Sequence, residues 1–352
     1  MKKSLYTKLQ NYERKKLRPR LWSYPSTLLI EPTNRCNIDC VMCFRHFSHT
    51  YPIGDMDNKI FEKLGPILPY IQEVNLQARG EPLLHKPLLS WIKQAKSAGT
   101  KVSFFTHGLL LTPAVIEQLV AVPLDLLTIS LDAATKIRFE TIRLRADFDT
   151  IISNIKNLVA YKRKNNSRSP ELQIHFVAMR QNIEELPLVL KLAKEFDVTN
   201  VIVEHLWVFD AAIIQETLFL EPERMHRYFE LARKTARELN LNLVLPSEKP
   251  IKFCEPAVLK QSGLTQFEYL MQNNSILTHS DEYYCLEPWR IAIIYWNGDI
   301  SPCCYTDRIM GNLRQHSFRE IWNNSEYRKF RRNIKKGPLP KECVNCRRLQ
   351  KK

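Results

Sequence analysis

The chain has 352 residues, 44% of them apolar, which is enough for one large domain and a smaller one with a sizeable core. No run of eighteen or more apolar residues occurs, and the first residues lack the apolar segment of a signal peptide. Composition therefore argues against a membrane protein and predicts a soluble, cytoplasmic one. Most of the nine cysteines occur in groups, and in a reducing compartment grouped cysteines are typical of metal ligands rather than of a disulfide framework.

The formal charge of +15 is concentrated at the two ends of the chain. Residues 1–20 carry a net +7 and residues 326–352 a net +9, whereas the other 305 residues sum to −1. Two interpretations stay open: solvated basic ends, or a docking surface for an acidic partner such as a peptide or a nucleic acid. The ends lack the interleaved aromatic residues of a single-strand-binding platform, which argues against nucleic acid.

After a basic lead-in at residues 1–25, the pattern predicts six strand–helix units. The expected strands are 27–31, 73–78, 101–106, 124–131, 172–179 and 200–207, and the expected helices are 58–70, 87–98, 113–120, 134–144, 149–164 and 183–196. Gly99 is a typical helix stop, and Thr112 before Pro113 is a typical helix start. A bridging segment at 211–284 contains a further helix at 222–239 and a strand at 241–245.

The expected strands are continuous apolar runs, which is typical of a parallel sheet buried on both faces. Six units are too few to close an eight-stranded barrel, so the sequence predicts an α/β fold with a partial (βα)6 barrel at 26–210. In such barrels the chemistry lies at the carboxyl ends of the strands. A small α+β domain is expected at 285–352.

A cysteine loop follows the first strand, at that end. Cys36, Cys40 and Cys43 are spaced C-x3-C-x2-C. Three thiolates in so short a loop can hold one [4Fe–4S] cluster, whose fourth iron is left open to bind and activate another molecule. A structural zinc site or three reduced thiols are the alternatives, although zinc sites usually use paired ligands.

This spacing, with Met42 just before the third cysteine, resembles the radical SAM superfamily. The resemblance implies the partial barrel, S-adenosylmethionine bound to the open iron, and its one-electron cleavage to a 5′-deoxyadenosyl radical. It also implies an external electron donor of the flavodoxin or ferredoxin type.

Loops after three further strands carry residues that resemble the family's cosubstrate contacts. Gly80, Glu81 and Pro82 resemble its GGEP motif, with Arg79 in place of the first glycine, and imply binding of the S-adenosylmethionine amino group. Thr106 precedes His107 and Gly108, where relatives often have Thr-Asn-Gly, and the role of His107 stays open. Ser130 and Asp132 resemble a ribose-binding segment, with a helix cap as the alternative. Glu204 and His205 end the sixth strand and face either the pocket or a neighbouring helix; for the histidine a structural role is the default.

The C-terminal region contains a second set of cysteines. Cys285, an Asn297-Gly298 hairpin of type I′, Cys303, a helix at 318–332 capped by Ser317, and Cys343-x2-Cys346 follow in order. This order resembles the SPASM/twitch extension of radical SAM enzymes and implies one auxiliary [4Fe–4S] cluster with all four irons ligated, serving as an electron conduit or acceptor. A zinc ribbon is the alternative. Cys304 could replace Cys303, donate hydrogen or merely pack.

Cys254 has no metal-ligand spacing around it, so it is either an inert buried thiol or a hydrogen-atom donor. Hydrogen return from Cys254 or Cys304 predicts epimerisation, whereas electron loss to the auxiliary cluster predicts oxidation or cross-linking.

The resemblance favours a peptide or natural-product substrate, which a separate partner could present. An aminosugar or another small molecule is the alternative. A zinc-containing nucleic-acid-binding protein and an electron-transfer protein without cosubstrate cleavage are the rivals from other classes.

Overall fold

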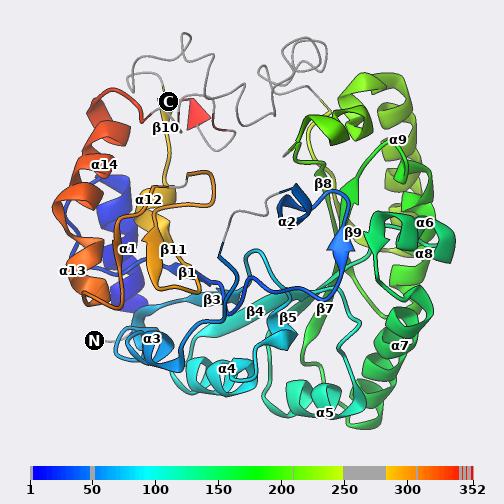
Figure 1. The fold of residues 1–352 in the computed structure, drawn as a ribbon, viewed down its shortest axis with the longest axis horizontal. Helices are drawn as coiled ribbons and strands as arrows, with labels where there is room; N and C mark the ends of the chain where they lie inside the picture. Colours follow the sequence, from blue (N-terminus) through cyan, green and yellow to red (C-terminus); the bar gives the residue numbers. More distant parts are fainter. Residues whose placement is uncertain are drawn as a thin grey trace. The chain divides into compact units, whose positions relative to one another are not determined.

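The computed structural model describes residues 3–47, 52–208, 210–248, 283–306, 308–340, 343, 346 and 350–351. Its contacts divide the chain into two compact units (Figure 1). Unit 1 contains Met1–Arg35, Ile53–Ser103 and Leu270–Lys352, and unit 2 contains Cys36–Pro52 and Phe104–Tyr269. This division cuts across the four segments that the sequence predicts, whose boundaries stay a prediction.

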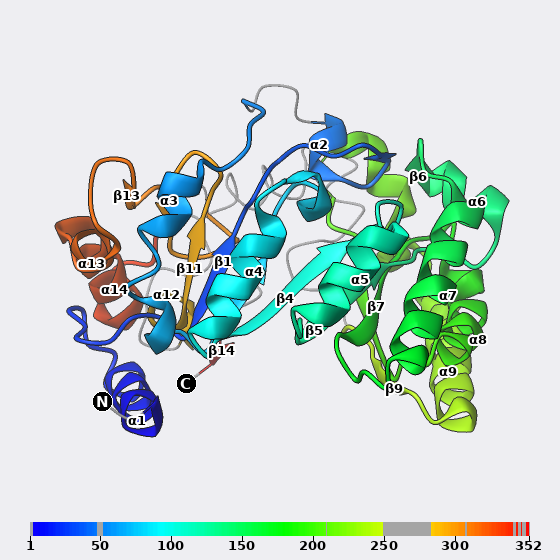
Figure 2. The ribbon, with the colours of Figure 1, turned by 90° about the horizontal axis from the view of Figure 1, so that it is seen from below.

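Unit 1 combines the two ends of the chain with the second and third strand regions. Its strands are β1 (Thr27–Ile30), β3 (Glu73–Leu76), the start of β4 (Lys101–Thr106), β10 (Tyr283–Tyr284), β11 (Ile291–Ile294), β12 (Asp299–Ser301), β13 (Gly311–Asn312) and β14 (Gln350–Lys351). Its helices are α1 (Lys3–Lys15), α3 (Asn58–Glu62), η1 (Leu68–Tyr70), η2 (Pro82–Leu84), α4 (Leu88–Ser97), α12 (Glu287–Arg290), α13 (Phe318–Trp322) and α14 (Ser325–Lys336). In Figure 2, α3 and α4 cover one face of these strands.

The main sheet of unit 1 has the order β13-β12-β11-β1-β3-β4. Strand β1 pairs in parallel on both sides, so that Leu28 lies opposite Val74 of β3 and Ala292 of β11. The first strand of the C-terminal region is therefore hydrogen-bonded directly to the strand that precedes the cysteine loop.

The hairpin between β11 and β12 differs from the expected type I′ turn. The Gly298 N–H donates to the Tyr295 carbonyl at 2.8 Å, and the Tyr295 N–H donates to the Asp299 carbonyl at 2.9 Å. Of the two turn residues only Gly298 has a positive φ, 92°. The expectation is wrong because the Asn297 side chain accepts the Asp299 N–H at 3.1 Å, which favours a type I turn followed by a left-handed glycine.

Two long helices of the sequence analysis are shorter in the structure. The helix expected at 58–70 ends at Glu62 and continues as turns before η1. The helix expected at 318–332 is two helices, with Ser317 capping α13 in a capping box. Asn324 starts α14 instead, because its side chain accepts the Tyr327 N–H.

Unit 2 contains the cysteine loop and the later strand–helix pairs. Its strands are β2 (Asp39–Cys40), β5 (Leu126–Ser130), β6 (Arg143–Leu144), β7 (Glu171–Ala178), β8 (Asn200–His205) and β9 (Asn242–Val244). Its helices are α2 (Phe44–Phe47), α5 (Pro113–Ala121), α6 (Lys136–Ile142), α7 (Phe148–Lys164), η3 (Ile183–Glu185), α8 (Leu186–Glu195), η4 (Ala211–Glu216), η5 (Leu218–Leu220) and α9 (Pro222–Leu239). The order β5-β7-β8-β9 is parallel throughout, so the predicted α/β class is confirmed.

The expected burial of both sheet faces is wrong for several strands. Alternate residues of β1, β3 and β7 are buried, while those between them are only partly buried. In β7 the partly buried positions are Gln173, His175 and Val177. In these strands one face is therefore buried and the other is only partly buried. In the described part of the chain, no helix is long and apolar enough to cross a membrane.

The core of unit 1 contains a stacked aromatic pair beneath α4. Phe61 and Trp91 are 0% and 1% exposed, and their rings lie 4.3 Å apart at an interplanar angle of 2°. The Trp91 indole N–H also donates to the Asn58 side chain at 2.6 Å. Helix α3, which carries Asn58 and Phe61, is thereby fixed to α4.

Phe61→Ala should lower the free energy of unfolding by about 3–5 kcal/mol, because it leaves a cavity against Trp91 that the surroundings fill only in part. Ile137→Ala is the control, since that side chain is 85% exposed. The control should change the free energy by less than about 0.5 kcal/mol. Urea denaturation followed by circular dichroism measures both, and equal losses in the two variants would contradict this packing.

Candidate functional site

The first cysteine loop is held by a short antiparallel pairing within unit 2. Cys40 in β2 lies opposite Arg143 in β6, and the Val41 N–H donates to the Ile142 carbonyl at 2.9 Å. The Cys43 N–H donates to the Cys40 carbonyl at 3.0 Å, so this C-x2-C segment closes as a turn. Cys36, Cys40 and Cys43 are free thiols and partly buried. Burial raises the pKa of Cys40 to about 12, Arg143 opposes this rise, and the neighbouring thiolates of Cys43 and Cys36 add to it.

Arg143 joins this loop to the sheet. Its Nη1 donates to the Cys40 sulfur at 3.6 Å, and its Nε donates to Asp132 Oδ2 at 2.7 Å. The other oxygen of Asp132 accepts the Val177 N–H at 2.8 Å. Burial lowers the pKa of Arg143, but the Asp132 carboxylate and the Cys40 thiolate outweigh burial and keep the guanidinium charged. Both carboxylate oxygens of Asp132, which the sequence predicts to bind ribose, thus accept protein hydrogen bonds.

His107 supports the same loop as a neutral imidazole. Its Nδ1 accepts the Leu109 N–H at 3.0 Å, so Nε2 carries the proton that it donates to Asn37 Oδ1 at 2.9 Å. Burial, together with the positive charge of Arg143, lowers the pKa of His107 to about 3. His107 therefore positions Asn37, the residue after the first cysteine.

The other predicted residues of unit 2 lie in different surroundings. Thr106 is 2% exposed, and its hydroxyl accepts the Gly108 N–H at 3.1 Å. Ser130 is partly buried at the end of β5. Met42 belongs to an apolar cluster with Ile142, Met179, Leu206, Val208, Ile213 and Ile214. Cys254 lies outside the described residues.

The residues at the end of the sixth strand have protein partners. Glu204 Oε2 lies 3.2 Å from His175 Nε2. The ring nitrogen Nε2 of His205 lies 2.8 Å from the Ser247 carbonyl, and the ring packs against Phe219 at 4.5 Å. This agrees with the structural role expected for His205.

In unit 1, the Gly80 loop packs on the backbone just before Cys36. The Glu81 N–H donates to the Arg35 carbonyl at 2.8 Å. A Cβ at Gly80 would lie 2.4 Å from the Thr33 carbonyl oxygen and 2.5 Å from that of Arg35, so only glycine fits. Glu81 is 2% exposed, and its Oε1 accepts the Leu83 N–H at 3.2 Å to start η2, which begins with Pro82.

Glu31, which the sequence analysis did not single out, joins this loop to the C-terminal hairpin. Its carboxyl is fully buried and accepts the Trp296 N–H at 3.2 Å. Burial raises the pKa of Glu31, while the charge of Arg79 and the N–H groups of Trp296 and Arg79 lower it. The guanidinium of Arg79 lies 4.7 Å from the Tyr295 ring centre. Arg79, where the motif has glycine, thus contacts the hairpin.

The C-terminal cysteines gather around Cys303 in unit 1. Cys303 and Cys343 are buried, Cys285 and Cys346 are partly buried, and Cys304 is exposed. Burial raises the pKa of Cys303, the Tyr305 N–H opposes this, and the thiolates of Cys304, Cys346 and Cys285 add to the rise. The Cys346 N–H donates to the Cys343 carbonyl at 3.2 Å, the same turn that closes the Cys40–Cys43 segment.

Both cysteine sets fit an iron–sulfur cluster by their donor chemistry. The first set offers three free thiols in one short loop, with a guanidinium that donates to the Cys40 sulfur. The second offers four free thiols: Cys285, Cys303, Cys343 and Cys346. Thiolates are the usual ligands of such clusters, and hydrogen bonds to sulfur tune their reduction potentials.

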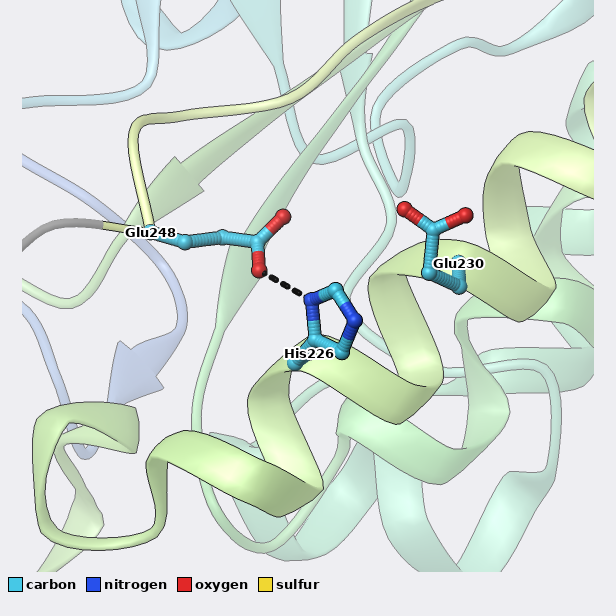
Figure 3. A group of neighbouring side chains, drawn as sticks. All are labelled: His226, Glu230 and Glu248. Atoms are coloured by element: carbon cyan, nitrogen blue, oxygen red, sulfur yellow. Dashed lines mark hydrogen bonds and ion pairs between the residues drawn. The ribbon is translucent and has the colours of Figure 1, made fainter.

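One group of oxygen and nitrogen ligands lies apart from the cysteines. His226, Glu230 and Glu248 face one another on α9 and the segment after β9 (Figure 3). Arg233 Nη2 donates to Glu248 Oε1 at 2.6 Å, and Arg233 also forms an ion pair with Glu230. The guanidinium already supplies the positive charge that a metal ion would bring, so this group is a surface ion-pair network.

Sequence reasoning missed Arg143, Asn37 and Glu31. Each acts through a partner far away in sequence or through a backbone group, so local spacing carries no signal for it. The one sequence signal for Glu31 is an acidic residue placed directly after an apolar strand and just before the cysteine motif.

Gly80→Ala should displace the loop from residues 33–35, because its contacts there are carbonyl oxygens that cannot move aside. We expect a loss of about 1–3 kcal/mol in the free energy of unfolding and weaker binding of S-adenosylmethionine to the anaerobically reconstituted protein. Gly65→Ala is the matched control, since its nearest contact is 3.1 Å away. Calorimetry measures both quantities, and unchanged cosubstrate affinity in Gly80→Ala would contradict the role of this loop.

Two protein-family models match the chain. A model of the radical SAM superfamily matches residues 30–193, and a model of the SPASM iron–sulfur cluster-binding domain matches residues 285–347. The first domain implies a [4Fe–4S] cluster with S-adenosylmethionine, and the second implies auxiliary iron–sulfur binding.

Three characterised relatives align along most of the chain. The tungsten-containing aldehyde ferredoxin oxidoreductase cofactor-modifying protein of Pyrococcus furiosus is 24% identical over 339 residues, which cover 91% of this chain and 86% of that protein. The AdoMet-dependent heme synthase of Methanosarcina barkeri is 25% identical over 354 residues, covering 92% and 91%. A PqqA peptide cyclase of Xanthomonas euvesicatoria is 26% identical over 343 residues, covering 92% and 80%.

Two solved structures of Streptococcus suis SuiB share the fold. The complex with S-adenosylmethionine has a TM-score of 0.66 at 16% identity and covers 92% of this chain and 72% of that one. The complex with the precursor peptide SuiA has a TM-score of 0.62 at 18% identity and covers 95% and 74%. With both domains matched in the expected order, the chain is an enzyme that belongs to the radical SAM superfamily and carries a C-terminal SPASM domain.

Proposed function

We propose that this enzyme cleaves S-adenosylmethionine reductively at the Cys36, Cys40 and Cys43 loop and oxidises a peptide substrate, forming a cross-link or ring. The observation that carries the proposal is the loop itself: three free thiols beside the buried Arg143–Asp132 pair, in a chain of the radical SAM family. With cluster and cosubstrate bound, the site supplies a 5′-deoxyadenosyl radical, which abstracts a substrate hydrogen atom.

The chain's own residues orient the bound groups. Arg143 fixes Cys40 and places positive charge beside the cluster ligands, and Asp132 holds that guanidinium in place. His107 fixes Asn37, so the loop keeps its shape between Cys36 and Cys40. Gly80 permits the close approach of Glu81 to the backbone before Cys36, where we place binding of the cosubstrate amino group. We assign the ribose contact to Ser130, since both carboxylate oxygens of Asp132 bond to protein.

An oxidative outcome requires a group that takes the second electron from the substrate. The C-terminal region provides four thiols for such a group: Cys285, Cys303, Cys343 and Cys346. Cys303 is buried, and Cys285 and Cys346 are close enough to raise its pKa. With four thiol ligands no iron is left open for a second cosubstrate, which supports an electron-transfer role.

Two similar proteins favour a peptide substrate. The relative from Xanthomonas euvesicatoria is a peptide cyclase, and SuiB was solved with a precursor peptide. A cofactor is the second candidate, because the two other relatives modify a tungsten enzyme cofactor and synthesise haem. The partly buried face of β7 carries polar Gln173 and His175, whose protein partners are Thr128 and Glu204.

The reconstituted protein with dithionite and S-adenosylmethionine should produce 5′-deoxyadenosine without substrate, and Cys43→Ala should abolish it. The loss is expected because two thiols do not hold the cluster. Liquid chromatography with mass spectrometry measures the product, and reactions without dithionite are the control. A colourless protein that holds zinc, or one that holds iron but leaves the cosubstrate intact, would overturn the proposal.

Reaction in deuterated water separates oxidation from epimerisation. Oxidation predicts a product that is two hydrogens lighter and takes up no solvent deuterium at carbon. Epimerisation predicts unchanged mass apart from one deuterium, with uptake lost in Cys254→Ala or Cys304→Ala. Mass spectrometry of the modified peptide distinguishes the two reactions. Deuterium at the reacting carbon would show epimerisation and contradict the proposed cross-linking.

A further inference from the structure

The two basic ends of the chain, which lie far apart in sequence, meet in unit 1. Helix α12 packs against both α1 and α14 (Figure 1). The Lys335 ammonium donates to the Lys16 carbonyl at 3.0 Å, and Arg331 Nη1 donates to the Pro19 carbonyl at 3.1 Å. The described basic residues of α1, of the segment after it and of α14 therefore lie together in unit 1.

Side chains of the C-terminal helices fix the segment after α1. Asn323 pairs with both backbone groups of Leu21, at 2.8 and 3.0 Å. The Trp322 indole N–H donates to the Ser23 carbonyl at 2.9 Å, and the Trp289 indole N–H donates to the Arg18 carbonyl at 2.7 Å. The basic segment is thus bound to the SPASM region, which gives the surface a defined shape.

The described part of this surface presents many exposed cations, with one exposed acid among them, Glu326 in the first turn of α14. We call it the basic face, and its exposed members are Lys8, Lys15, Lys16, Arg20, Lys329, Arg332 and Lys336. None of these seven forms an ion pair with a carboxylate in the described residues. Glu13 is 2% exposed and accepts hydrogen bonds from Trp22 N and Ser23, so it does not neutralise them. Uncompensated like charges at one surface attract an anionic partner.

Helix α14 separates this surface from the C-terminal cysteines. Lys329, Arg332 and Lys336 follow one another at helical spacing on its exposed side. Its inner side buries Tyr327, Phe330, Arg331 and Ile334. The ring of Phe330 on this inner side lies 5.7 Å from the guanidinium of Arg308, in the segment that follows Cys303 and Cys304. A partner on the basic face would thus lie across α14 from that segment.

The aromatic residues of the basic face are not free for base stacking. Tyr12 and Trp22 are 49% and 65% exposed, but the Arg18 guanidinium lies 5.4 Å and 5.6 Å from their rings. Binding of single-stranded nucleic acid depends on open aromatic faces as well as positive charge. The nearby cysteines favour instead a partner that exchanges electrons.

We propose that the basic face docks an acidic one-electron carrier protein of the flavodoxin or ferredoxin type. On docking, the carrier loses one electron and an iron–sulfur cluster of this chain gains it, with no bond made or broken. The proposal rests on the proposed function, because reductive cleavage of S-adenosylmethionine needs such an electron. Attraction between the acidic carrier and the basic face would raise the association rate and make it depend on salt.

The test compares two triple variants with the same change of charge. Lys329→Glu, Arg332→Glu, Lys336→Glu removes the α14 part of the basic face. Lys93→Glu, Lys156→Glu, Lys191→Glu changes exposed lysines of α4, α7 and α8. Each reconstituted protein is assayed for 5′-deoxyadenosine with a reduced acidic flavodoxin and, separately, with dithionite, at low and high ionic strength.

With flavodoxin at low ionic strength, we expect the α14 variant to be slower by about tenfold or more, and the control to retain most of the wild-type rate. High salt should remove most of the difference, and dithionite should drive all three proteins equally. A neutral variant with glutamine at the three α14 positions should fall between wild type and the glutamate variant. If it matches wild type, or if the α14 and control variants slow equally with flavodoxin, the proposal is wrong.

Two further results separate failure of the docking proposal from failure of the proposed function. Failure of wild type with dithionite refutes the proposed function, and titration of labelled flavodoxin against the three proteins still tests docking by itself. Tight binding of a short single-stranded RNA that the α14 variant alone loses, with unchanged flavodoxin kinetics, would make the basic face a nucleic-acid surface and overturn the docking proposal.

Discussion

The arrangement of the first cysteine loop depends on one buried ion pair. The side chains of Arg143 and Asp132 are 8% and 0% exposed. Removing two charges from water costs several kcal/mol per ion, which only close geometry and further hydrogen bonds can offset. Here the further bonds join Asp132 to Val177 N and Arg143 to the Cys40 sulfur. Neither Arg143 nor Asp132 can leave this pair without exposing a buried charge to an apolar surrounding. The position of Cys40 therefore depends on the positions of β5, β6 and β7.

The two sides of β1 give unit 1 a second constraint. Strand β1 exchanges backbone hydrogen bonds with β3 and with β11, so the Gly80 loop and the C-terminal hairpin both follow strands fixed to β1. Glu31, at the end of β1, accepts the Trp296 N–H of that hairpin. A fully buried carboxyl in this place couples the loop that precedes Cys36 to the SPASM region. The domain found last in the sequence is thus part of the framework that holds residues 31–35.

The basic character of α14 has two physically different parts. Arg331 is fully buried, stacks on Trp322 and Tyr327 at 4.1 and 4.6 Å, and donates to the carbonyls of Pro288 and Trp322 at 2.9 and 2.8 Å. Burial lowers the pKa of Arg331 to about 9, with Tyr327 and Glu13 opposing the change. Its role is to join helices, whereas the exposed cations of the same helix remain available to a partner. A charge count along the sequence does not distinguish the two.

The amino-acid sequence determined those features of the protein that depend on near neighbours. The cysteine spacings, the caps at Thr112 and Ser317, and the strand–helix order are local patterns, because a loop, a cap or a strand forms within a few residues. Only the tertiary structure decided that Arg143 contacts Cys40, that His107 is neutral beside Asn37, and that the described basic residues of the two ends lie together. These contacts join residues that lie 70 to 319 positions apart. Burial and charge then act between side chains whose proximity no local pattern records.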